Sequence, residues 1–384
     1  MPPHPRPRRR RRDDHDLGLG SSLAPGGPQT AATGDIDAFR QALEKDGFTV
    51  QEGNLGFLDL VTLLDEGVLP SAYGNNPATR YLSYFVPPAP GFPVDEKFAA
   101  IAERLGVSTN ASSFWKLRPD EAIVFVGRTP PECRYFSLDC VLMDRTYGNE
   151  TRWLFANIAD PLNNLEINTS GTPNESAGNP FDQVTVIVAT ADRTIDIRIR
   201  EAAESAGYPG EIMNTMIFPS SMLNLGLENS SDSFLMALRP ALFTDPQAGA
   251  EYINNTPATI FRITPREASE PDPFDYPPLR VHGTGTTELD LADDLEELRM
   301  AILDRYGDLN ATELPTSPGF PAGSDAIQRG VNAVSPTNDT AYLWSATRNV
   351  NLPSPPFFNT SKYYDFLRDP PVTLGNRSGE SIIV

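Results

Sequence analysis

Proline is the residue that most constrains how this chain can fold. The sequence has 37 prolines in 384 residues, and many stand in clusters such as 86–93, 271–278 and 352–356. A proline lacks the backbone N–H and fixes φ, so these clusters fit neither a helix interior nor a central strand. We therefore expect short helices and strands joined by long ordered loops.

The first half of the chain between these clusters is dominated by strand patterns. Helices are expected at 35–45, 57–65 and 95–105, each with an apolar face or a closing glycine. Alternating runs rich in aromatic and β-branched residues predict strands at 81–86, 114–118, 122–126, 134–142 and 152–158. The pattern indicates an antiparallel sheet or sandwich over roughly 78–170.

The second half has a more definite order of elements. Strand, helix, strand, strand, helix and strand are expected at 184–189, 194–205, 213–218, 234–238, 246–253 and 259–263. This is the βαββαβ order of a ferredoxin-like unit. A further strand at 279–282 leads into a helix at 288–306. The predicted fold class is therefore α+β, an antiparallel β-rich N-terminal half followed by a ferredoxin-like unit.

Four regions are expected from these patterns. They are a disordered tail rich in Arg, Pro and Gly (1–34), a domain of helices and antiparallel strands (35–175), a ferredoxin-like domain with a C-terminal helix (176–315), and a Pro- and Asn-rich extended tail (316–384). The last region contains a strand at 341–344 that we expect to return to a sheet. The chain stops in an apolar run at 381–384, which indicates a sequence truncated there.

The strongest functional signal is the number of N-glycosylation acceptor motifs. The motif N-x-[ST], with no proline in the middle, occurs ten times. Chance placement of the 23 asparagines gives about 3 such motifs at this content of Ser and Thr. The excess predicts a eukaryotic secretory glycoprotein; the alternative is that Asn, Ser and Thr merely share polar loops. The acceptors are Asn110, Asn149, Asn168, Asn174, Asn229, Asn254, Asn310, Asn338, Asn359 and Asn376.

The start of the sequence argues against a secreted protein. An arginine run at 6–12 is followed by polar residues, with no apolar segment typical of a secretory leader. Taken literally, this run is a nuclear or nucleic-acid tag, and the chain is then an intracellular protein with an Arg-rich tail. We expect instead that the leader is missing from this sequence, and that the protein is extracellular or in the secretory pathway.

The charge and hydropathy of the chain limit the classes of partner that we expect. The net charge of -20 repels phosphate backbones and anionic lipid, so no nucleic acid is expected as a partner. No apolar run approaches 18 residues, so no membrane span is expected. An extracellular ligand or glycan is the remaining class. Asp272 and Asp275 suggest calcium, but they lack the alternating oxygen-ligand loop that would support it.

Histidine is almost absent, which argues against metal sites and catalytic mechanisms that need several histidines. Only His282 lies outside the first 34 residues, so a histidine-based zinc or iron site is not expected, and neither is any cofactor. His282 lies where a strand passes through a glycine turn to a helix N-terminus, a place that favours anions. Candidate ligand contacts there are Arg280, Thr284 and Thr286, and candidate catalytic groups are His282, Glu288 and Asp290. The alternative is that Thr287 and Asp290 only cap the helix.

A carboxylate mechanism needs no histidine. A glycoside hydrolase uses two carboxyl groups at a set separation. Candidates that the sequence cannot rank are Asp139, Asp144, Asp192, Asp196, Glu288 and Asp290. Whether the chain is an enzyme stays open at this point.

Two cysteines lie seven residues apart in a region that reads as strand. Cys133 and Cys140 form either a short disulfide or a pair of buried free thiols. Both alternatives are compatible with the sequence.

The segment 127–137 combines a G-R-x-P turn with R-Y-x-S. It resembles a strand-turn-strand motif of secreted or periplasmic β-rich proteins of unknown function. The resemblance covers about a dozen residues, implies an extracytoplasmic sheet domain and transfers no catalytic residue. Arg128 and Arg134 become candidate ligand contacts, with pairing to acidic surface residues as the alternative.

Together these features predict a secreted glycoprotein, acting as an extracellular or cell-surface binding protein. The alternatives are a secreted carboxylate-dependent, glycosidase-like hydrolase and an intracellular protein with an Arg-rich tail. The sequence names neither a substrate nor an oligomeric state.

Overall fold

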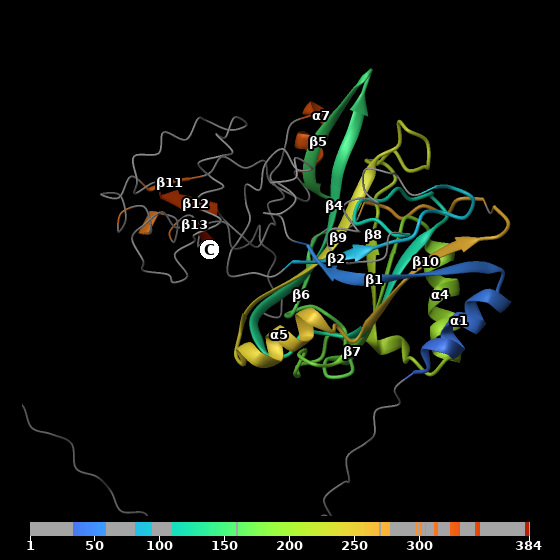
Figure 1. Ribbon diagram of the computed structural model, residues 1–384, viewed down its shortest axis with the longest axis horizontal. Helices are drawn as coiled ribbons and strands as arrows, with labels where there is room; N and C mark the ends of the chain where they lie inside the picture. Colours follow the sequence, from blue (N-terminus) through green and yellow to red (C-terminus); the bar gives the residue numbers. More distant parts are fainter. Residues whose placement is uncertain are drawn as a thin grey trace, which may run out of the picture. The chain divides into compact units, whose positions relative to one another are not determined.

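A computed structural model describes residues 34–58, 81–93, 110–158, 160–268, 270–276, 311–313, 323–330, 342–345 and 381–383, and the single residues 297, 300, 301 and 304. The described part contains one large mixed sheet with its helices (Figure 1) and a small antiparallel sheet. The small sheet has the order β11-β12-β13, from β11 (Ala311–Glu313), β12 (Tyr342–Ser345) and β13 (Ser381–Ile383). The strand expected at 341–344 is thereby confirmed as β12.

The large sheet has the strand order β5-β4-β9-β2-β1-β10-β3-β7-β8, and β6 pairs with β4. All neighbours are antiparallel except β7 and β8. Its strands are β1 (Phe48–Phe57), β2 (Leu82–Phe85), β3 (Ala122–Arg128), β4 (Cys133–Tyr147), β5 (Glu150–Asn157), β6 (Leu162–Asn163), β7 (Val184–Thr190), β8 (Met213–Ile217), β9 (Ser233–Phe243) and β10 (Ala258–Pro265). The helices are α1 (Ile36–Lys45), α4 (Arg193–Ser205), α5 (Pro246–Asn254) and α7 (Gly323–Arg329), with short 3-10 turns η1 (Pro173–Glu175) and η2 (Gly210–Ile212).

The expected fold class is wrong, although the order of elements behind it is right. The elements β7, α4, β8, β9, α5 and β10 follow one another as βαββαβ. A split βαβ unit has another strand between the two that its helix connects, but β8 lies directly beside β7. The strand β9 pairs with β4 and β2, and β10 pairs with β1 and β3. Strands from before and after residue 175 therefore alternate in one sheet, instead of forming a β-rich half and a ferredoxin-like half.

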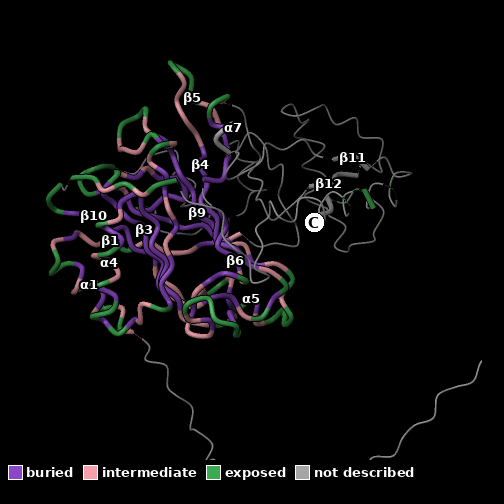
Figure 2. Tube along the Cα trace, turned by 180° about the vertical axis from the view of Figure 1, so that it is seen from behind, coloured by how far each residue is buried: buried purple, intermediate pink, exposed green. Residues whose placement is uncertain are grey.

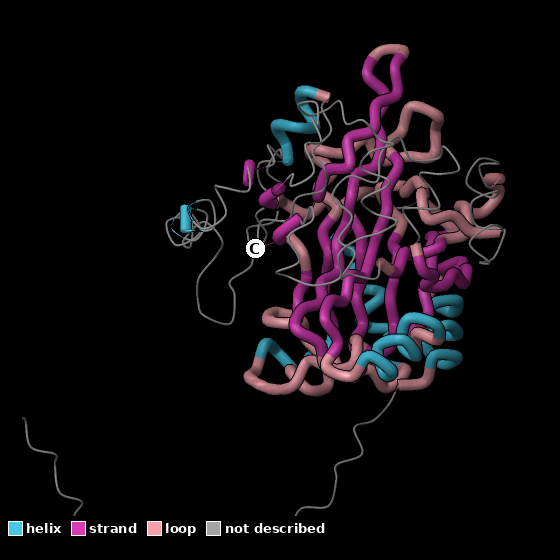
Figure 3. The backbone as a smooth tube through the Cα atoms, turned by 60° about the vertical axis from the view of Figure 1, so that its left-hand side comes forward, coloured by secondary structure: helices cyan, strands magenta, loops and turns pink. Residues whose placement is uncertain are grey.

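The large sheet curls until its distant strands meet. Six strands lie between β4 and β8 in the sheet order, yet Cys140 Sγ is 4.0 Å from Met216 Sδ. Tyr84, Met236 and Ile260, from three of the intervening strands, are fully or almost fully buried in the same core. The strands lie side by side in Figure 3, and buried residues run along their middle sections in Figure 2. The curled sheet is a half-barrel whose inner face forms the main core.

Two helices cover part of the outer face. Asp35 caps α1 by accepting hydrogen bonds from Asp37 N and Ala38 N, and Asp192 caps α4 through Ile195 N. Phe39 and Leu43 of α1, together with Ile199 of α4, are fully buried against the strands β3, β7 and β10. The helices therefore protect the central strands, which is why these strands carry continuous apolar runs.

The sequence patterns missed β1 because it contains turn-forming residues. The strand includes Gly53, Asn54 and Gly56, which are depleted in strands. A Cβ added at Gly53 would lie 2.2 Å from the carbonyl oxygen of Phe85. Glycine is required there because the backbone at the end of β2 approaches β1 too closely for a side chain.

The two cysteines are free and buried, so the disulfide alternative is wrong. Both lie on β4, where Cys133 is opposite Phe243 and Cys140 is opposite Met236. Seven residues of one strand span about 23 Å, whereas bonded cysteines need Cα atoms within about 7 Å. The free-thiol alternative is confirmed, because a continuous strand cannot bring its own distant side chains together.

Thiol titration should give two reactive thiols per unfolded chain. Burial raises the pKa of Cys133 to about 11, so little thiolate is present in the folded protein at neutral pH. We expect slow reaction with a thiol reagent in buffer and rapid reaction of both cysteines in denaturant without a reductant. A titre of zero in denaturant would show a bond between the two thiols and contradict the structure.

Candidate functional site

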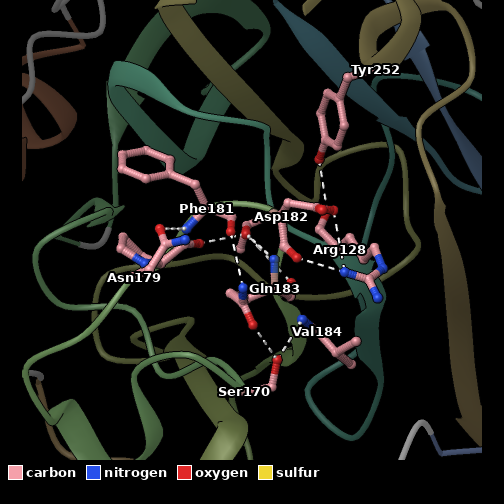
Figure 4. A network of polar contacts seen from close by, with 10 residues as sticks. Arg128, Ser170, Asn179, Phe181, Asp182, Gln183, Val184 and Tyr252 are labelled. Atoms are coloured by element: carbon pink, nitrogen blue, oxygen red, sulfur yellow. Dashed lines mark hydrogen bonds and ion pairs between the residues drawn. The ribbon is translucent and has the colours of Figure 1, made fainter. Parts of the chain in front are cut away.

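The loop between β6 and β7, residues 164–183, carries predicted site residues and is hydrogen-bonded to the sheet; we call it the acceptor loop. It contains the acceptors Asn168 and Asn174. Thr129, the residue after β3, donates its hydroxyl to Pro180 O at 2.5 Å and accepts from Gln183 N at 3.0 Å. Figure 4 shows Gln183 and the neighbouring residues of this network from close by. The loop is therefore attached to the sheet at its C-terminal end.

Arg128 belongs to the same network. Its guanidinium donates to Asp182 O at 2.6 Å and to Asp182 Oδ1 at 3.2 Å. The hydroxyl of Tyr252, on α5, donates to Arg128 O at 2.8 Å (Figure 4). Burial raises the pKa of Tyr252, so this hydroxyl keeps its proton and remains a donor. The expected alternative for Arg128, pairing to an acidic surface residue, is confirmed.

Arg134 does not join this network. It is exposed on β4, away from Asp182 and Tyr252 in the network of Arg128. Its role as a ligand contact stays a prediction.

The acceptor asparagines divide by exposure. Asn110, Asn149, Asn174, Asn229 and Asn254 are exposed, whereas Asn168 is half-buried. Asn149 lies in the tight turn between β4 and β5, and Asn254 is the last residue of α5. Asn310, Asn338, Asn359 and Asn376 lie outside the described residues.

The expected anion site lies outside the described residues as well. This applies to all six of its candidates, namely Arg280, His282, Thr284, Thr286, Glu288 and Asp290. The structure therefore does not test the turn-to-helix site.

Two of the candidate carboxylates have structural roles. Asp192 caps α4 and also accepts from Asp272 N at 2.8 Å. Asp196 accepts from Arg200 Nε at 2.8 Å and from Thr215 Oγ1 at 2.9 Å, which joins α4 to β8. Burial raises the pKa of Asp196 in spite of the nearby guanidinium of Arg200. These hydrogen bonds hold the helix on the sheet.

Asp139 is a candidate carboxylate with polar neighbours from two strands. It lies on β4 and is 3% exposed. Ser137 Oγ donates to its Oδ2 at 3.2 Å, and Arg239 Nε lies 3.6 Å from the same oxygen. Arg239 also stands over the ring of Tyr135 at 5.7 Å. Side chains alternate along β4, so the sequence alone could have predicted that Ser137 and Asp139 lie on the same face. The position of Arg239 depends on the pairing of β9 with β4, which the sequence near either residue does not indicate. Asp144, also on β4, is half-buried.

The described residues contain no group of three or more His, Cys, Asp or Glu side chains that would suit a metal ion. Asp272 and Asp275, considered for calcium, lie 3.0 Å and 3.7 Å from the guanidinium of Arg193. Both carboxylates therefore form ion pairs with Arg193. Across the same described ranges, none of the helices has the length and apolar character that crossing a membrane requires.

No protein-family model, curated protein or solved structure matches this chain.

Proposed function

We propose that this protein is a secreted glycoprotein that binds an extracellular ligand or glycan at or outside the cell surface. The observation that supports this proposal most strongly is the exposure of the acceptor asparagines. Five of the six acceptors in the described residues are exposed, but only three of the eight other described asparagines are, namely Asn179, Asn224 and Asn255. The buried Asn157, Asn163 and Asn214 all lie outside acceptor motifs.

The exposure of the acceptor asparagines supports the proposal. An N-linked glycan is bulky and hydrophilic, so it needs an asparagine at the surface. The turn at Asn149 and the helix end at Asn254 meet that need.

We favour binding over catalysis because several buried carboxylates are paired with arginine side chains. Glu121 is paired with Arg262, Asp232 with Arg145, and Asp196 with Arg200. Such pairs hold elements together, and their charges are not directed at solvent. The hydrolase alternative retains Asp139 with its neighbours Ser137 and Arg239. Hydrolysis of a polysaccharide panel by the purified protein would favour that alternative.

The proposal is tested by the intact mass of the protein from its own source, before and after peptide-N-glycosidase treatment. We expect the mass to fall by several glycan units on treatment. The control is the same chain made in a bacterial cytoplasm, whose mass should not change. An identical mass before and after treatment of the native protein would reject secretion and favour the intracellular alternative.

A further inference from the structure

Two acceptor motifs lie close together in the acceptor loop, at 168–170 and 174–176. They are equivalent as sequence motifs, but their residues differ in burial and in hydrogen bonding. Asn168 Oδ1 accepts from Glu175 N at 2.6 Å, so the first motif is hydrogen-bonded to the second.

The backbone of Asn168 is bonded to the edge of the sheet. Its N–H donates to Asn214 Oδ1 at 2.9 Å. Its carbonyl oxygen accepts from Thr185 Oγ1 at 2.7 Å and from Asn214 Nδ2 at 2.9 Å. Asn214 and Thr185 are 5% and 1% exposed, so Asn168 attaches the loop to a buried polar cluster on β7 and β8.

The other residues of the first motif are also used by the fold. Thr169 is fully buried, and its Oγ1 accepts from Gly171 N and Thr172 N. Ser170 Oγ donates to Gln183 Oε1 at 2.8 Å and accepts from Val184 N at 3.1 Å (Figure 4). The hydroxyl that completes the acceptor motif therefore fixes the start of β7.

The second motif is presented to solvent. Asn174, Glu175 and Ser176 are all exposed. Asn174 has φ +49° and Glu175 has φ +58°, both in the left-handed region that is uncommon outside glycine. Such residues persist where surrounding contacts hold them, and the hydrogen bond from Glu175 N to Asn168 is one such contact.

We infer that Asn174 is the glycosylated residue of this loop, and that Asn168 is a positioning residue that carries no glycan in the folded protein. The inference rests on the proposed function and adds the choice between the two motifs. A glycan on the half-buried amide of Asn168 would have to fit where the loop meets Asn214 and Glu175. The sugar would be attached to Nδ2 of the same amide whose Oδ1 accepts from Glu175 N, so a modified chain would have to open the loop to make room for it.

The test compares three variants of the protein secreted from eukaryotic cells. N174Q should lose the mass of one glycan and keep the wild-type midpoint of thermal unfolding. N168A should keep its full glycan mass but unfold at a lower temperature, because Glu175 N loses its acceptor. N168D, which retains an oxygen at that place and cannot be glycosylated, should keep both the mass and most of the thermal stability.

Peptide mass spectrometry after deglycosylation in heavy-oxygen water identifies the modified asparagines directly. A label on Asn174 and none on Asn168 is the expected result. A label on Asn168, or no mass loss in N174Q, would overturn the inference while leaving the proposed function intact if other acceptors are labelled. Complete absence of label would overturn both.

Discussion

Replacing Arg262 by methionine is expected to lower the free energy of unfolding by about 3–5 kcal/mol, because it leaves a buried carboxylate without its counter-charge. The side chains of Arg262 and Glu121 are 1% and 0% exposed. Arg262 donates to both oxygens of Glu121, at 3.2 Å and 2.6 Å. It also donates to the carbonyl oxygens of Pro87 and Lys116, so one side chain joins β10 to the loop after β2 and to the segment before β3.

The measurement is urea unfolding followed by tryptophan fluorescence. The double variant E121M/R262M should recover much of the loss, since neither charge then remains in the core. The recovery should be incomplete, because Thr264 Oγ1 and Arg118 N also donate to Glu121. A loss below about 1 kcal/mol for R262M, the range of surface pairs, would show that the pair is not buried as described.

The pH dependence of this loss gives a second readout of the same prediction. Burial by itself would raise the pKa of Glu121, but the charge of Arg262 and hydrogen bonds from Arg262, Arg118 and Thr264 lower it overall. A carboxyl with a lowered pKa stabilises the fold above its unfolded pKa, and that contribution is lost as pH falls through the folded pKa. In R262M burial dominates and raises the pKa. The difference between wild type and R262M should therefore shrink as the pH is lowered.

Replacing Asp232 by alanine should cost a similar amount, about 3–5 kcal/mol. Its carboxylate is fully buried and accepts from Arg145 Nε at 2.9 Å and from the second guanidinium nitrogen at 2.5 Å. The same carboxylate accepts from Asn224 N at 2.8 Å. Burial disfavours the charge of Arg145, but Asp232 raises the pKa of that guanidinium overall. Without Asp232, Arg145 is left largely buried with no opposite charge.

The loop before β9 should open at the same time. Lys116 Nζ donates to the carbonyl oxygens of Glu228, Asn229 and Ser231, and Asp232 closes the loop beyond them. We expect limited proteolysis of D232A to cut between residues 222 and 232 first. The matched control is D182A, which breaks a pair whose side chains are 42% and 71% exposed and should cost about 0–1 kcal/mol. Equal losses in the two variants would contradict the distinction between buried and surface pairs.

Local sequence patterns predicted most of the elements that appear in the described residues. The strands β3, β4, β5, β7 and β10 and the helices α1, α4 and α5 lie where periodicity placed them, because alternation and capping depend on neighbours in the chain. The segment 114–118 was expected to be a strand, but it forms only an isolated bridge between Trp115 and Phe234. Its aromatic residues fill the core from a loop.

The candidate site was less predictable than the elements. The ten acceptor motifs are visible in the sequence, but nothing local distinguishes Asn168 from Asn174. The difference comes from Asn214 and Thr185, which follow Asn168 by 46 and 17 residues and meet it only in the folded sheet. Arg239, the neighbour of Asp139, comes from the pairing of β9 with β4 in the same way.

The sequence by itself thus determined where most of the strands and helices form, the acidity of the chain, its low histidine content and the positions of its acceptor motifs. Those properties depend on residue type and on near neighbours. Only the tertiary structure decided four other features. They are the strand order, the separation of Cys133 from Cys140 along β4, the pairing of Glu121 with Arg262, and the different environments of the two acceptor motifs in the acceptor loop. Each depends on which distant strands pair, and that is set by the burial of the whole apolar surface at once.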